Sequence, residues 1–357
     1  MKELEYPFDA AYIIKKRKSL KKALLADGTS RIRKKIAVFG GSTTSDIVKT
    51  LELFLLDAGI EPEFYESEYA QYFQDAMFPD ETLLSFKPDI VFIHTTNRNV
   101  TDWPEMTDTT EQIDEKLHTE INRFTAMWKS IAEKFHCPII QNNFEMPLYR
   151  LLGSRDAWDI HGRTNFLTRL NEAFYAYARE NESFYIHDLN FVSADYGLKE
   201  WSNPLFWNMY KYAMCFEAIP SFAFSVSHII KSIFGKNKKA LALDLDNTLW
   251  GGVVGDDGVD GIEIGQETGV SQSYYEFQTY VKQLKSLGIV LTVCSKNDHE
   301  NAIAGLNHPE GALRPDDFVI IKANWENKDR NIAETAAELN ILPDSIVFAD
   351  DNPAERE

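Results

Sequence analysis

Hydrophobic and polar positions alternate along the chain in blocks that predict strands followed by helices. In roughly the first two thirds, short apolar runs predict strands at 36–39, 89–94, 138–141 and 184–187. Helical spacing of apolar residues predicts helices from 47 to 58, over 112–135 and near 220–234. Such alternation is typical of α/β domains built on mainly parallel sheets.

The same alternation begins again after a predicted break between two domains. The segment GKNKK, residues 235–239, joins glycine to polar and basic residues and reads as a linker. Beyond it, the pattern predicts strands at 240–246, 289–294, 318–321 and 345–349, with helices at 272–287, near 298–306 and at 328–339. We therefore expect two three-layer α/β/α domains, residues 1–234 and 240–357. The sequence stops one turn into the helix expected after the last strand, which points to a shortened product.

Composition narrows the class of protein. Of the 357 residues, 44% are hydrophobic and 26% charged, ordinary values for a globular protein. A net charge of −18 argues against nucleic acid or an anionic membrane as a general partner. The three cysteines show no paired spacing, which suits a reducing compartment. The first residues lack the apolar core of a signal peptide and no run approaches a membrane span, so we expect a cytoplasmic protein.

The segment LALDLDNTLW, residues 241–250, carries the clearest chemical signal. A buried strand there would project Asp244 and Asp246 from its C-terminal tip. Carboxylates two residues apart on a strand repel each other unless a divalent cation lies between them, and oxygen ligands of this kind favour Mg²⁺. One Asp can then attack phosphorus while the other handles the leaving-group proton. The alternative is a pair of solvated aspartates in a turn.

Three further segments place polar residues at strand ends or helix starts. Ser295, in TVCSKND, can donate a hydrogen bond to a phosphoryl oxygen or can simply cap the next helix. Lys328 opens a helix, where its ammonium would neutralise phosphoryl charge or would merely be exposed. Asp350 and Asp351 end a strand and would complete a set of Mg²⁺ ligands.

In order and in strand context, these segments resemble the four motifs of the haloacid-dehalogenase-like (HAD) superfamily. The resemblance implies that Asp244 is the nucleophile, Asp246 the general acid/base and Lys328 the residue that holds the charge. The residues that it implies for orienting the Asp loop or binding phosphate are Thr248, Ser295, Lys296 and Asn297. The Mg²⁺ ligands or their helpers are Asp244, Asp246, Asp350 and Asp351.

The spacing between the motifs leaves no room for a cap domain. Between Thr248 and Ser295, only residues 250–271 are not needed for the core, which is enough for a glycine-rich flap. The interval from Ser295 to Lys328 is equally short. We therefore expect an open site, which suits a macromolecular substrate or a cavity completed by another domain.

The sequence around the four motifs points to one branch of this superfamily. The stretches LDLDNTLWGGVVGDDGVDGI, SLGIVLTVCSKND, LRPDDFV, NWENKDRNI and FADDNPAERE resemble the FkbH-like family, a capless HAD branch (subclass IIIC), over residues 240–357. Characterised members are glyceryl transferase/phosphatases. They take the acyl group of bisphosphoglycerate, remove phosphate and load glyceryl onto an acyl-carrier-protein thiol. The resemblance thus implies a phosphorylated small-molecule substrate and an acyl carrier protein as partner.

Cys294 is a candidate for a thiol relay in that chemistry. A thiolate at a helix N-terminus is stabilised, so Cys294 is expected to hold a transient acyl thioester, unless it is a small buried hydrophobe. Two other functions stay open. One is a plain phosphatase acting on a small phosphoester, and the other is a non-catalytic scaffold, against which the complete set of acidic and basic motif residues argues.

The N-terminal domain resembles SGNH hydrolases in part. FGGSTTSD places Ser42 on a strand-to-helix turn, and HTTN ends in Asn97, matching blocks in which Ser attacks and Asn helps the oxyanion hole. Where that family has Asp-x-x-His, this chain has NPLF at 203–206. The possible substitutes, more simply read as packed or surface residues, are His187, His228 and Asp188. We expect an SGNH/flavodoxin-like fold with lost or altered catalysis that positions the carrier protein or covers the HAD site.

Overall fold

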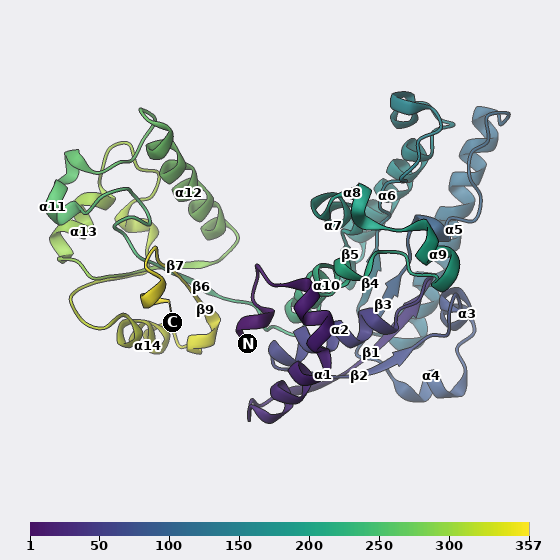
Figure 1. Ribbon diagram of the computed structural model, residues 1–357, viewed down its shortest axis with the longest axis horizontal. Coiled ribbons are helices and arrows are strands. Elements are labelled where there is room, and N and C mark those ends of the chain that lie inside the picture. The colour runs from purple at the N-terminus through teal and green to yellow at the C-terminus, as the bar shows by residue number, and fades with distance from the viewer. Residues whose placement is uncertain (357) are drawn as a thin grey trace. The chain divides into compact units, whose positions relative to one another are not determined.

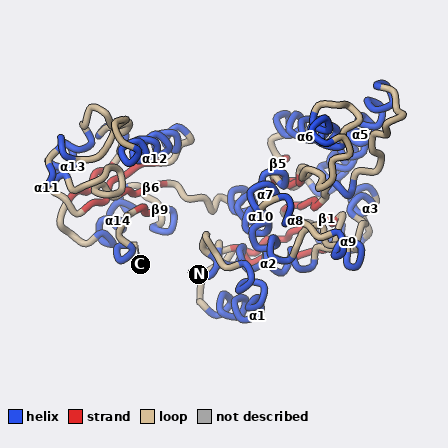
Figure 2. The backbone as a smooth tube through the Cα atoms, turned by 45° about the horizontal axis from the view of Figure 1, so that its top comes forward, coloured by secondary structure: helices blue, strands red, loops and turns tan. Residues whose placement is uncertain are grey.

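The computed structural model describes residues 1–356, and contacts divide the chain into two compact units, Met1–Gly235 and Lys236–Glu357. In each unit, helices flank a central sheet of parallel strands (Figures 1 and 2). The α/β class expected from the sequence is confirmed. No helix in this described part of the chain has the length and apolar character needed to cross a membrane.

The N-terminal unit is built on a five-stranded sheet in the order β2-β1-β3-β4-β5, with every neighbouring pair parallel. Its strands are β1 (Ile32–Gly40), β2 (Ile60–Glu66), β3 (Ile90–His94), β4 (Ile139–Asn142) and β5 (Phe184–His187). This is the order of the flavodoxin-like doubly wound fold. Such sheets bind ligands outside the carboxyl ends of the strands where the order reverses, here between β1 and β3.

Helices cover both faces of this sheet. One core cluster includes α1 (Ala10–Ala26), α2 (Ser45–Asp57), α7 (Leu189–Tyr196), α8 (Leu198–Trp201) and α10 (Ile219–Ile233). The cluster on the other face includes α3 (Tyr72–Met77), α4 (Glu81–Phe86), α5 (Thr110–Phe135) and α6 (Arg163–Glu180). The short helix α9 (Pro204–Tyr210) lies between α8 and α10 in the chain.

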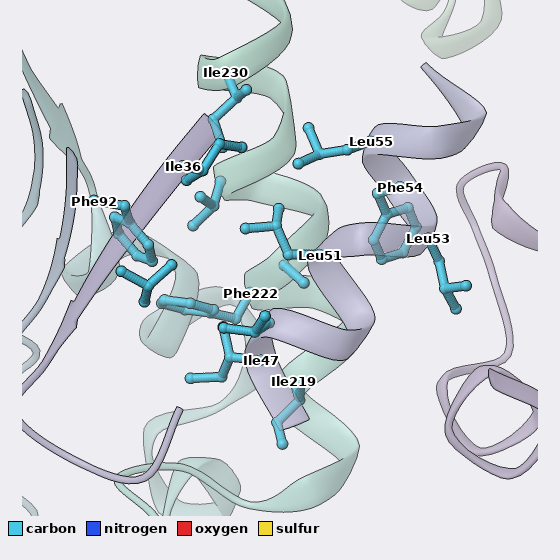
Figure 3. Close-up of a cluster of buried hydrophobic side chains, with 14 of the residues drawn as sticks. Ile36, Ile47, Leu51, Leu53, Phe54, Leu55, Phe92, Ile219, Phe222 and Ile230 are labelled. Carbon is cyan, nitrogen blue, oxygen red and sulfur yellow. The ribbon is translucent and has the colours of Figure 1, made fainter. Parts of the chain in front are cut away.

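Alternation along the buried strands assigns side chains to the two faces. Ile36 of β1 and Phe92 of β3 lie with Leu51 of α2 and Phe222 of α10 in one cluster (Figure 3). Ala37, the next residue of β1, belongs to the cluster on the opposite face. A strand buried on both faces reads as a continuous apolar run, which is why β1 and β3 are recognisable in the sequence.

The C-terminal unit has a four-stranded parallel sheet in the order β8-β7-β6-β9. Its strands are β6 (Ala240–Leu243), β7 (Val290–Ser295), β8 (Ile320–Ala323) and β9 (Ile346–Ala349), and its helices are α11 (Val254–Asp257), α12 (Gly269–Ser286), α13 (His299–Leu306) and α14 (Lys328–Glu338). Residues of α12 and α13 share a core with one face of β6 and β7, and residues of α14 share one with the other face. The strand order reverses between β6 and β9.

Candidate active site

Three carboxylates meet at the point where the order of the C-terminal sheet reverses. Asp244 follows β6, and Asp350 and Asp351 follow the adjacent strand β9. Each offers an oxygen that lies within 4.8 Å of those of the other two. Asp244 and Asp350 are 7% and 6% exposed, whereas Asp351 is exposed. Parallel strands that end at one sheet edge therefore bring together acids more than a hundred residues apart in the chain.

Lys328 neutralises part of this charge. It is the first residue of α14 and 5% exposed, and its Nζ lies 3.0 Å from Asp244 Oδ2 and 2.5 Å from Asp350 Oδ2. Burial alone would lower the pKa of the lysine. Its hydrogen bonds to Asp350 and Asp244 outweigh that effect, so the pKa is raised and the side chain stays an ammonium.

The remaining features of the cluster fit a divalent cation. Asp244 Oδ1 is buried and has no hydrogen-bond partner, an expensive arrangement for a carboxylate oxygen that a metal ion would satisfy. Three carboxylates against one ammonium leave excess negative charge, and carboxylate oxygens are the ligands that Mg²⁺ prefers. Within residues 1–356, no other group of three or more His, Cys, Asp or Glu side chains is close enough to hold a metal.

Asp246 lies beside this group and is held by three donors. Its Oδ1 accepts hydrogen bonds from Trp250 Nε1 at 2.9 Å and from the Val254 amide at 3.0 Å, and its Oδ2 accepts one from Asn297 Nδ2 at 2.9 Å. Burial and the neighbouring Asp244 carboxylate raise its pKa. The carboxyl group is thus fixed in place next to the acid cluster.

This geometry corrects the expectation that the Asp246 side chain joins the metal-ligand group. The strand ends at Leu243, before either acid, so Asp244 and Asp246 do not share one face of a strand. Beyond the strand the chain turns, and Asn247 adopts a left-handed conformation with φ of 56°. The carboxylate of Asp246 accepts from the three donors described above and is not part of the group of acids close enough to hold a metal.

The candidate phosphate-binding residues divide into two sets. Thr248 Oγ1 accepts a hydrogen bond from the Asp351 amide at 3.1 Å, which ties the loop after β6 to the loop after β9. Asn297 donates to Asp246, and Ser295 is buried at the end of β7. The Lys296 ammonium is instead engaged at 2.7 Å by Glu355. The structure thus gives Lys296 an acidic partner outside the aspartate cluster.

Cys294 differs from the expected stabilised thiolate. Its side chain is buried against α14 and donates a weak hydrogen bond to the Lys328 carbonyl, with a sulfur–oxygen distance of 3.6 Å. Burial raises the pKa of the thiol to about 12, and the nearby Lys328 offsets only part of that effect. The expectation of a lowered thiol pKa is wrong because the helix start that follows β7 does not leave the sulfur exposed.

Residues 250–271 are anchored in the core by a few apolar side chains, which are Trp250, Val254, Ile262 and Ile264. Trp250 is fully buried against Gly305 of α13, where an added Cβ would approach its ring to 2.8 Å. Gly251 pairs with Glu263 in an antiparallel bridge, closing the segment on itself. Trp250 thus both fills the core and donates to Asp246. Its role was not predicted, although a buried indole N–H generally requires a polar partner.

The Ser42 loop of the N-terminal unit follows β1 at the other point of strand reversal. Ser42 is buried, and its Oγ has no hydrogen-bond partner. Asn99 Nδ2 donates to the Gly41 carbonyl at 2.9 Å, and an added Cβ on Gly41 would collide with the Asn99 amide. Asn97, the residue singled out in the sequence, instead donates through its Nδ2 to the Glu145 carbonyl at 3.3 Å. Asn99 is therefore the asparagine that contacts the serine loop.

His187, one of the proposed substitutes for a base, belongs to a buried hydrogen-bond network. Asn142 Oδ1 lies 2.9 Å from His187 Nδ1, and Asn142 Nδ2 lies 2.8 Å from His94 Nδ1. His187 Nε2 is 3.0 Å from Ser225 Oγ. Burial lowers the pKa of each histidine to about 3, so both are neutral near neutral pH. His187 is therefore a packed residue, which agrees with the simpler of its two interpretations from the sequence.

The other two substitutes are also engaged elsewhere. His228 lies on α10, where its Nδ1 is 2.8 Å from the Phe224 carbonyl. Asp188 caps α7 by accepting a hydrogen bond from the Phe191 amide at 3.1 Å. Among residues 1–356, no side chain forms the hydrogen bond with Ser42 Oγ that a general base would need.

We expect Mg²⁺ to stabilise the C-terminal unit through the acid cluster. At a concentration one hundred times its dissociation constant, the ion should stabilise folding by about 2.7 kcal/mol. That gain corresponds to a rise of roughly 10 °C in the unfolding temperature of a domain of this size. Asp351→Asn should weaken Mg²⁺ binding at least about tenfold, as loss of metal-site partners commonly does. Thermal unfolding with and without added Mg²⁺ measures both effects.

Asp344→Asn is the matched control, because this exposed aspartate lies before β9 rather than after it. It should leave the Mg²⁺ shift unchanged. If Mg²⁺ raised the unfolding temperature of wild type and of Asp351→Asn by the same amount, Asp351 would not be a ligand of the ion.

Comparisons with known proteins bear on both units. The family model described as FkbH, N-terminal domain, matches residues 35–231. A solved structure of the N-terminal part of the protein BF1531 from Bacteroides fragilis, containing a phosphatase domain complexed with Mg, is 31% identical and has a TM-score of 0.85. The match covers 95% of this chain and 89% of that one.

A putative lipolytic protein of the G-D-S-L family from Desulfitobacterium hafniense is 20% identical over 55% of this chain and 99% of its own. Its TM-score of 0.35 is too low to carry an argument. No curated protein matches the chain.

Proposed function

Because the chain belongs to the FkbH family, we propose that its C-terminal unit is a Mg²⁺-dependent phosphoryl-transfer enzyme of the HAD type, with Asp244 as nucleophile. At the level of the family, the relationship supports a HAD-like phosphatase. The assignment of Asp244 as nucleophile rests on how its two carboxylate oxygens are paired. One of its oxygens is paired with the Lys328 ammonium, and the other is buried without a partner.

Each residue of the cluster has a role in this proposal. Asp244 attacks phosphorus and displaces the leaving oxygen, forming an aspartyl phosphate. Asp246, fixed by its three donors, protonates that oxygen and then takes a proton from the water that hydrolyses the intermediate. Lys328 holds the negative charge of the nucleophile and of the phosphoryl group. Asp244, Asp350 and Asp351 would hold Mg²⁺, which neutralises charge on the phosphoryl oxygens.

The substrate that this proposal favours is a phosphorylated acyl donor whose acyl group is loaded onto a carrier protein. Both gaps between the motifs are filled by elements of the C-terminal unit's own fold, so residues 236–356 contain no inserted cap domain. A site without a cap admits a macromolecular partner. The thiol of the carrier would displace phosphate from an acyl phosphate to give a thioester. Hydrolysis of a remaining phosphoester, with water supplying oxygen and proton, releases a second phosphate.

A relay through Cys294 is a separate hypothesis. With a thiol pKa of about 12, Cys294 holds almost no thiolate near neutral pH, and the sulfur is buried. Direct attack by the carrier thiol needs no such group. For the N-terminal unit we propose altered or lost SGNH-type catalysis and a role in positioning the carrier, since Ser42 lacks a base.

Incubating the full chain with Mg²⁺, bisphosphoglycerate and a carrier protein that bears its thiol tests the proposal. Mass spectrometry of the carrier and an assay of free phosphate separate the outcomes. Acyl transfer predicts a glyceryl adduct sensitive to hydroxylamine, together with released phosphate. Phosphate without an adduct would leave a plain phosphatase, and neither product would favour a scaffold. Cys294→Ala should leave the adduct in place if the carrier thiol attacks directly, and should abolish it if the relay operates.

A further inference from the structure

The N-terminal unit contains a small cavity that is rich in arginine and tryptophan. Its volume is about 230 Å³, and it is lined by Asn97, Arg98, Trp103, Pro147, Arg163 and Trp207. Asn97 and Arg98 directly follow β3, whose carboxyl end adjoins the reversal of strand order between β1 and β3. Ligands of doubly wound sheets bind at this place. The cavity therefore lies where the fold favours a binding site, in a different unit from the acid cluster.

The two arginines present free donors to this cavity. The Arg98 guanidinium lies 4.7 Å from the ring centroid of Trp207, and that of Arg163 lies 4.9 Å from the ring centroid of Trp103. Contact with an aromatic ring holds each guanidinium in place and leaves N–H donors for a planar or tetrahedral oxyanion. In the described part of the chain, neither arginine forms an ion pair with an acidic side chain.

The nearest acid does not cancel this charge near neutral pH. Glu145 is buried beneath the Arg98 segment and accepts a hydrogen bond from the Asn97 amide at 3.2 Å. Burial raises the pKa of Glu145 to about 8, in spite of the attraction of Arg98. The carboxyl group is therefore mostly protonated at pH 7. The chain as a whole has a net charge of −18, but two guanidinium groups without acidic partners make this cavity locally positive. A locally positive cavity favours an anionic ligand.

A second cavity lies next to the first and is more apolar. Its volume is about 650 Å³, and Pro147 lines both cavities. Met146, Leu148, Tyr149 and Leu198 contribute to its wall, together with the charged Arg150 and Lys199. An occupant of both cavities would place an anionic group near the arginines and an apolar chain along residues 146–149.

We propose that these two neighbouring cavities bind an organic anion, in which a phosphate or carboxylate group contacts Arg98 and Arg163 and an attached apolar chain extends past Pro147 into the larger cavity. The proposal goes beyond the phosphoryl transfer assigned to the C-terminal unit and does not depend on it. It gives the N-terminal unit a binding function that needs no nucleophile and no base.

Calorimetric titration of the full chain with octyl phosphate, octanoate and inorganic phosphate, in the presence of a metal chelator, tests this site. Octyl phosphate or octanoate should bind at least about tenfold more tightly than inorganic phosphate, because the octyl chain is buried. Arg98→Ala and Arg163→Ala should each weaken binding about tenfold through loss of a charge-assisted hydrogen bond. Comparison of the two octyl compounds identifies the preferred oxyanion.

One control variant locates the binding. Arg179→Ala removes an exposed arginine from the other end of α6, the helix that Arg163 begins, and should leave the affinity unchanged. The proposal is overturned if neither octyl compound binds at millimolar concentration, or if the two arginine variants bind like wild type.

Discussion

Asp244→Asn is expected to reduce the kcat of phosphate release by about 10⁴-fold or more, because an amide cannot form the aspartyl phosphate. The substitution keeps the shape of the side chain. It also leaves the ion pair between Lys328 and Asp350 in place, so the fold should survive. Hydrolysis of p-nitrophenyl phosphate in the presence of Mg²⁺ measures the loss.

Asp260→Asn is the matched control for this variant. Asp260 is an exposed aspartate in the segment between the first two motifs and lies outside the acid cluster. Its substitution should leave kcat unchanged. If Asp244→Asn retained a tenth or more of the wild-type rate while folded, nucleophilic attack by Asp244 would be excluded.

Lys328→Met is expected to destabilise the C-terminal unit by about 3–5 kcal/mol when Mg²⁺ is absent, the usual cost of breaking a buried ion pair. The variant leaves the Asp244 and Asp350 carboxylates facing each other without their cation, and the Lys328 side chain is 5% exposed. Phosphate release should also fall, since no ammonium then holds the phosphoryl charge. Chemical denaturation followed by circular dichroism measures the change in stability.

Added Mg²⁺ should recover part of this loss, because the ion would lie among the same carboxylates. Lys322→Met provides the comparison. Lys322 also pairs with two acids, Glu334 and Glu338, but both of these are well exposed. Exposed pairs are worth about 0–1 kcal/mol, so this variant should change stability little. Equal effects of the two substitutions would contradict the assignment of a buried charge cluster around Lys328.

Much of the fold could be predicted from the sequence because most strands are buried on both faces. The apolar runs of β3 and β6 are examples, and each is recognisable as a strand because turns bound it. The edge strand β2 was not predicted, because Pro62 and alternating glutamates resemble a loop. The bounds of helix α1 were not predicted, since its many lysines favour a solvated helix face and only a few of its positions are buried.

The acid cluster was predictable for a different reason. Parallel strands end at one edge, so acids at strand ends can be brought together without knowledge of the loops, as Asp244 and Asp350 are. Side chains placed by loops were less predictable. The strand ends at Leu243, before Asp246, and a 3-10 turn brings Asn99 rather than Asn97 to the serine loop. Sequence spacing does not determine either direction.

Phosphorylation of Asp244 during turnover can be detected by chemical trapping. Quenching the wild-type enzyme with borohydride during hydrolysis in Mg²⁺ reduces an aspartyl phosphate to homoserine, which peptide mass spectrometry locates. We expect homoserine at the position of Asp244 and none there in Asp244→Asn. Rapid phosphate release with no reduced residue, or with homoserine at another aspartate, would exclude Asp244 as the nucleophile.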